Sequence, residues 1–132
     1  MLIQGDNEFG QLGLGEQIGP LCSFFPNFLK LDFFEEHKLD VVDVTFTAGS
    51  SHFLCREKES GRNRLFSVGN NDFGQLGNGS SLASHVPIDI SEKFSDEVIQ
   101  IASGGYHTLA ITNNNKVYGF GKRTKGQFAS RF

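Results

Sequence analysis

The chain has 132 residues, 38% of them hydrophobic, and a formal net charge of -3 at pH 7. It contains no apolar stretch long enough to cross a membrane and no signal-peptide pattern, which favours an intracellular location in the cytoplasm or nucleus. Its dispersed lysines and arginines give no direct nucleic-acid signal, and the spacing of its two cysteines indicates neither a disulfide framework nor a metal site.

The first element in the chain is a glycine-rich phrase from Gly5 to Gly15, which reads GDNEFGQLGLG. Stretches that alternate apolar with polar or small residues follow it, as in Val44–Thr47, and this alternation predicts β-strands. A glycine turn at Gly49 separates two of them. The strands expected in this half lie near 28–31, 44–48, 52–56 and 64–68.

The same phrase returns 64 positions later, where Gly69 to Gly79 reads GNNDFGQLGNG. A strand at Val86–Ile90 follows, and Pro87 within it predicts a sheet edge. Asn113–Asn115 predicts a tight hairpin, because asparagine tolerates positive φ. A weaker third copy of the phrase, GKRTKGQF, begins at Gly121. The other strands expected in this half lie near 98–103, 107–112 and 116–120.

Two linked motifs therefore recur, and insertions explain their unequal spacing. With these removed, a period near 50 residues remains, and each period holds a thin antiparallel sheet of about four strands. Such sheets bury their faces against one another, as in the blades of a β-propeller. We predict an all-β chain of about two blades. Its repeat units are 1–47, with an expanded connection after the first phrase, then 48–102, and finally 103–132, which is incomplete.

The repeated residues have a structural interpretation. Glycines permit sharp turns, asparagines bond their own turn, glutamines satisfy loop amides, and leucines fill the gap between blades. The residues assigned to this repeat motif are Gly5, Asn7, Gly10, Gln11, Leu12, Gly13, His52, Gly69, Asn71, Gly74, Gln75, Leu76, Gly77, His107, Gly121, Gly126 and Gln127.

The histidines of this motif have the same interpretation. His52 and His107 recur at the same place in each unit, so we expect them to be superposable and largely buried parts of the scaffold. A catalytic or metal-binding histidine would be expected once, in one converging cluster. No P-loop, nucleophile elbow or paired-acid motif is present. We therefore predict no catalytic residue, no metal, no cofactor and no enzyme activity.

The two phrases, the Gly-x-x-His-x-Leu strand and the following Val-Tyr-x-Phe-Gly together resemble the repeat of the regulator of chromosome condensation family. The resemblance covers almost the whole chain and implies a seven-bladed β-propeller, of which this chain would be a fragment. The family's tryptophan before the phrase is replaced by Gln4, Val68 and Phe120. The third phrase departs from the pattern at Arg123 and Phe128, among other positions. Exposed blade edges also predict self-association.

Members of that family include exchange factors for small GTPases, ubiquitin ligases, scaffolds and light receptors. The resemblance implies a noncatalytic protein–protein interaction module, with a protein partner that could be a small GTPase. The alternative is part of a guanine nucleotide exchange factor acting on a small GTPase, and the sequence does not decide between exchange factor, ubiquitin ligase and scaffold. The candidate interaction surface lies in the expanded connection after the first phrase. It comprises Phe24, Phe25, Phe28, Phe33 and Phe34. The alternative is that its aromatic rings pack between blades.

Overall fold

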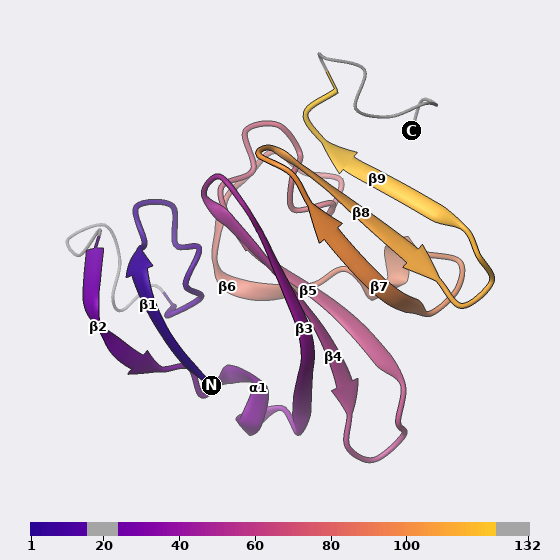
Figure 1. Cartoon of the computed structure of the whole chain (residues 1–132), viewed down its shortest axis with the longest axis horizontal. Coiled ribbons are helices and arrows are strands. Elements are labelled where there is room, and N and C mark those ends of the chain that lie inside the picture. Colours follow the sequence, from indigo (N-terminus) through magenta and orange to yellow (C-terminus); the bar gives the residue numbers. More distant parts are fainter. Residues whose placement is uncertain (16–23, 124–132) are drawn as a thin grey trace.

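The computed structural model describes residues 1–15 and 24–123, with the backbone only for 24–29, and it is built from antiparallel sheets. Figure 1 shows the sheets following one another along the chain, from the indigo amino terminus to the yellow last strand. The first sheet contains β1 (Leu2–Asp6) and β2 (Phe24–Lys30). The second contains β3 (Leu39–Thr47), β4 (Ser50–Glu57), β5 (Asn63–Gly69) and β6 (Ser84–Asp89). The third contains β7 (Val98–Ser103), β8 (His107–Thr112) and β9 (Val117–Gly121).

Each sheet is a meander, in which strands that are neighbours in sequence are hydrogen-bonded neighbours in space. Backbone conformation shows which strands correspond. Gly5 in β1, Gly69 in β5 and Gly121 in β9 all have positive φ, at 119°, 114° and 106°. The first sheet therefore holds the third and fourth strands of a unit, the second sheet all four, and the third sheet the first three. The boundaries of the sheets differ from those of the repeat units, because the repeated phrase lies between the third and fourth strands of a sheet.

The expected strands are confirmed, with small differences at their ends. β6 lies at the edge of the second sheet, as Pro87 predicted. Asn115 has the positive φ, 58°, that a tight hairpin requires. The sequence did not predict the short helix α1 (Phe33–Glu36), and β3 begins at Leu39, earlier than expected. A 3-10 turn at Ser91–Lys93 also leads from β6 toward the third sheet.

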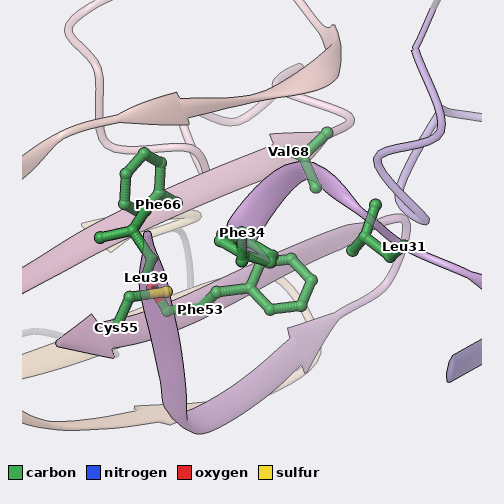
Figure 2. Close-up of a cluster of buried hydrophobic side chains, with 7 residues drawn as sticks. All are labelled: Leu31, Phe34, Leu39, Phe53, Cys55, Phe66 and Val68. Atoms are coloured by element: carbon green, nitrogen blue, oxygen red, sulfur yellow. Dashed lines mark hydrogen bonds between the residues drawn. The ribbon is translucent and has the colours of Figure 1, made fainter. Parts of the chain in front are cut away.

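The second sheet is buried on both faces, because successive side chains of a strand point to opposite sides. On one face, a cluster joins it to the connection from the first sheet (Figure 2); its buried members are Leu31, Phe34, Leu39, Phe53, Cys55, Phe66 and Val68. On the other face, a second cluster joins it to the third sheet, with Leu54, Leu65, Ile90, Val98, Ile101 and Ala110 buried. Residues 50–55 of β4 are accordingly all buried.

Candidate functional site

The strongest structural repetition lies in two loops, Gly5–Gly15 and Gly69–Gly79, which we call the first and second phrase loops. Their glycines at matching places have matching φ values: 76°, 70° and 82° at Gly10, Gly13 and Gly15, against 74°, 69° and 77° at Gly74, Gly77 and Gly79. The loops follow β1 and β5, the equivalent strands, and extend from the same side of the array (Figure 1). The two loops therefore repeat the same backbone conformation.

A buried asparagine organises each loop from inside. The side-chain oxygen of Asn71 accepts the Leu76 N–H at 3.0 Å, and its amide nitrogen donates to the carbonyls of Ser80 at 2.8 Å and Leu82 at 3.0 Å. Asn71 is completely buried. Asn7 accepts the equivalent N–H in the first loop, also at 3.0 Å. These bonds satisfy backbone groups that no strand pairs with.

A glutamine fixes the tip of each loop. Gln75 Oε1 accepts the N–H of Phe73 at 2.9 Å, and Gln11 Oε1 accepts that of Phe9 at 3.0 Å. Gln75 is fully buried, whereas Gln11 is half-buried. Phe9 and Phe73 are consequently held at the same place in the two loops, each on a backbone that its own glutamine positions.

His52 ties the second phrase loop to its own sheet. The ring is fully buried, and its Nε2 lies 2.7 Å from the carbonyl oxygen of Gln75. A carbonyl only accepts, so Nε2 carries the proton and donates it. Burial lowers the pKa of His52 from 6.5 to about 4, although the hydrogen bond to the Gln75 carbonyl opposes this shift. His52 is therefore a neutral scaffold residue at neutral pH.

His52 is buried as expected, but His107 is not largely buried and the two histidines are not superposable. His52 lies opposite Ser67, two residues before the phrase glycine, whereas His107 lies opposite the phrase glycine Gly121 itself. His107 is also half-buried. The two turns are equivalent, because Thr47 pairs with Ser50 and the Gly104 N–H donates to the His107 carbonyl. His107 therefore corresponds to Ser50, and the sequence alignment of Gly49 with Gly104 is wrong by two positions. Gly126 and Gln127 of the third phrase lie outside the described residues.

Acid should destabilise the fold through His52. Its contribution is complete above pH 6.5, where the residue is neutral in both states, and is lost as pH falls toward 4, because only the unfolded chain takes up the proton. From pH 7 to pH 4.5 this residue should lower the free energy of unfolding by about 2 kcal/mol. Urea unfolding of the wild type and of His52→Gln at both pH values isolates the effect. An equal loss in both proteins would contradict a buried neutral His52.

Each phrase loop also packs against the next sheet. The missing Cβ of Gly77 leaves room for Phe120 of β9, since an added Cβ would lie 2.8 Å from a ring carbon. The same ring lies 5.7 Å from the ring of His52, centroid to centroid. In the first loop, an added Cβ at Gly13 would lie 3.2 Å from Pro87 of β6 and 3.6 Å from Val68 of β5. Val68 and Phe120 each precede a phrase glycine, so one contact recurs between successive sheets.

Aromatic rings remain accessible on the outer side of the phrase loops. Phe9 is 38% exposed and Phe73 is 43% exposed. Phe73 packs edge-to-face against Tyr106 of the β7–β8 connection, with ring centroids 5.4 Å apart. The Lys122 ammonium lies 4.7 Å from the Phe73 centroid and 5.2 Å from that of Tyr106. This arrangement binds a cation by attraction to the faces of two rings.

The rings of the predicted interaction surface do not form one exposed patch. Phe34 is a core residue, 2% exposed, with its ring centroid 4.8 Å from that of Phe53. Phe33 is half-buried and stacks on His37 at 4.2 Å. Phe24, Phe25 and Phe28 lie in β2, and their side chains fall outside the described residues. Phe34 was mistaken for a surface residue because α1 turns it into the sheet.

A cavity of about 520 Å³ lies beside Phe33, next to the β4–β5 hairpin. Its central charge is Arg64, which forms ion pairs with Glu57 and Asp89 across the cavity wall. The lining also includes Lys38, Lys58 and Glu59, so its formal positive and negative charges balance. Sequence reasoning did not single out this cavity, because Arg64 and Asp89 are 25 residues apart in the chain.

The titratable groups with the largest shifts are inaccessible to substrates. Burial raises the pKa of the Cys55 thiol to about 12, with the charge of Asp89 adding to the shift. Within residues 1–15 and 24–123, no three His, Cys, Asp or Glu side chains are arranged to hold a metal ion. Over the same residues, no helix has the length and apolar character needed to span a membrane.

Comparison with known proteins matches this chain to a family of repeats. Two models described as the Regulator of chromosome condensation (RCC1) repeat match residues 62–111 and 98–127, which together span half of the chain. The chain is 29% identical over 127 residues to the ultraviolet-B receptor UVR8 of Arabidopsis thaliana, covering 93% of this chain and 25% of the receptor. The chain thus spans about a quarter of the length of that curated relative.

Solved structures show the same architecture. The crystal structure of human WBSCR16 superposes with a TM-score of 0.71 at 22% identity, covering 93% of this chain and 29% of WBSCR16. Yeast Prp20 superposes with TM-scores of 0.67 in its complex with Kap60, at 20% identity, and 0.64 in a second structure, covering 91% and 89% of this chain and 27% and 28% of Prp20. The predicted fold is therefore confirmed, and the chain forms a partial β-propeller.

Proposed function

The chain belongs to the regulator of chromosome condensation repeat family, and we propose that it acts as a noncatalytic protein-binding module. The observation that carries the proposal is that the side-chain oxygens of Asn71 and Gln75 accept backbone N–H groups of their own phrase loop. Because these bonds fix the loop backbone from inside, the outward side chains are presented on a defined frame. Such a frame suits recognition of a protein surface.

The relatives support a protein as the partner. One Prp20 structure contains bound Kap60, and the other was described together with the binding of Prp20 to Gsp1p and histones. Because Gsp1p is a small GTPase, the second candidate function is a contribution to guanine nucleotide exchange on such a GTPase.

Binding and release assays separate the two functions. The purified 132-residue chain is titrated into Kap60, into histones and into Gsp1p loaded with a fluorescent guanine nucleotide. A binding module gives saturable binding to at least one of these proteins without faster nucleotide release. Accelerated release would establish the exchange function instead. Absence of saturable binding to all three would contradict the proposed module.

A further inference from the structure

We propose that the first phrase loop is a docking point for a basic protein segment, with Glu8 and Phe9 contacting an arginine or lysine of that segment. The proposal rests on the protein-binding function above and specifies which surface binds and what chemistry it recognises. Its starting point is a contact that the chain makes with itself at the equivalent place in the second phrase loop.

The second phrase loop already holds a cation on its aromatic surface. Lys122 lies over both Phe73 and Tyr106, within the distance at which ring faces attract an ammonium group. Asp72 precedes Phe73 and is exposed. Asp72 and Phe73 are therefore neighbours on the loop, and Lys122 of the same chain places its positive charge over the Phe73 ring.

The first phrase loop repeats this carboxylate and ring, and among the described residues no lysine or arginine lies over its ring. Phe9 is equivalent to Phe73 and packs over Gly49 of the β3–β4 connection, where an added Cβ would lie 2.7 Å from a ring carbon. Asn70, which also packs against Gly49, follows the phrase glycine of β5 as Lys122 follows that of β9. Lys122 thus places an ammonium group beside the second phrase loop, whereas Asn70 places a neutral amide at the equivalent position beside the first.

The charge around Phe9 favours a basic partner. Glu8 and Asp6 are both exposed, and the Glu8 N–H donates to Asp6 Oδ1 at 2.9 Å, which fixes the backbone that carries them. In the second loop, Asp72 corresponds to Glu8 and the neutral Asn70 corresponds to Asp6, and Lys122 lies over the Phe73 ring. The first loop therefore combines two carboxylates with an exposed ring, and an arginine can stack on the ring while it bonds a carboxylate. The same carboxylates disfavour nucleic acid, whose phosphates are negative.

The test uses the full chain and a fluorescent peptide of arginine–glycine repeats, with a citrulline–glycine peptide as the uncharged control. Fluorescence anisotropy measures affinity at low and high salt, and amide chemical-shift changes locate the binding site. We expect binding of the arginine peptide only, weakening with salt, with shifts centred on Glu8, Phe9 and Asn70.

Three variants make the expectation specific. Glu8→Gln and Phe9→Leu should each weaken binding roughly threefold, since each removes one contact of an exposed cation. Leucine retains apolar packing over Gly49 but has no ring face, and far-ultraviolet circular dichroism checks that both variants are folded. Lys122→Ala should instead strengthen binding roughly twofold to threefold, because it frees the second aromatic pair for the peptide.

Two results would overturn the proposal: no binding of the arginine peptide, or equal affinity in the wild type and in both first-loop variants. A third outcome is that Kap60, histones or Gsp1p bind saturably with an affinity that neither Glu8→Gln nor Phe9→Leu changes. The chain would then be a binding module whose binding surface is not the first phrase loop. If Kap60, histones and Gsp1p all failed to bind while the arginine peptide still bound at Glu8 and Phe9, the proposed function would be wrong. The site for basic segments would remain.

Discussion

Replacing Asn71 with alanine is expected to lower the free energy of unfolding by about 4 kcal/mol. The substitution removes the bond accepted from the Leu76 N–H and the bonds that the amide nitrogen donates to Asn78, Ser80 and Leu82. The buried Leu76 N–H is left unpaired, at a cost of about 1–3 kcal/mol, and each lost bond to the partly buried acceptors adds about 1 kcal/mol. Urea unfolding followed by circular dichroism measures the change.

Asn113→Ala is the matched control, because Asn113 is exposed in the β8–β9 hairpin. The same chemical change there should alter the free energy of unfolding by less than about 0.5 kcal/mol. If Asn71→Ala cost no more than this control, the loop would not depend on the bonds of Asn71.

Replacing Gly77 with alanine should cost about 3 kcal/mol for two separable reasons. The residue has φ of 69°, which an alanine adopts at a cost of about 1 kcal/mol or more. Its new Cβ would also lie 2.8 Å from the Phe120 ring, and such overpacking costs about 1–3 kcal/mol. Thermal or urea unfolding gives the total.

Gly74→Ala separates the two contributions, because Gly74 has nearly the same φ, 74°, but no atom within 4 Å of an added Cβ. This control should lose only the conformational part, about 1 kcal/mol. The double variant Gly77→Ala with Phe120→Leu should recover part of the Gly77→Ala loss. Equal losses at Gly74 and Gly77 would show that the loop does not pack against β9.

The strands and the phrase loops could be predicted because the signal for them is local and repeated. Alternation in Val44–Thr47 and the turn chemistry of Asn115 depend on neighbouring residues, so they hold in the folded chain. The burial of Phe34 could not be predicted, because it depends on the short helix that turns the ring toward Phe53, 19 positions later. Composition alone does not distinguish a ring of the core from a ring of a binding surface.

The candidate site was only partly predictable for the same reason. The repeated Asn71 and Gln75 indicated a self-bonded loop, but the ring contacts of Phe73 join residues more than 30 positions apart. The register of His107 could not be predicted, because aligning Gly49 with Gly104 differs by two positions from the strand pairing that the structure shows. Side-chain proximity across sheets requires the folded structure.

A nuclear Overhauser spectrum of the labelled 132-residue chain tests most directly whether the phrase loops join successive sheets into one propeller array. We predict cross-peaks between the Gly77 α-protons and the Phe120 ring protons, and between the Gly13 α-protons and the methyl groups of Val68, because these groups are in contact. Absence of both sets of cross-peaks, together with different rotational correlation times for the second and third sheets, would contradict a continuous array of packed blades.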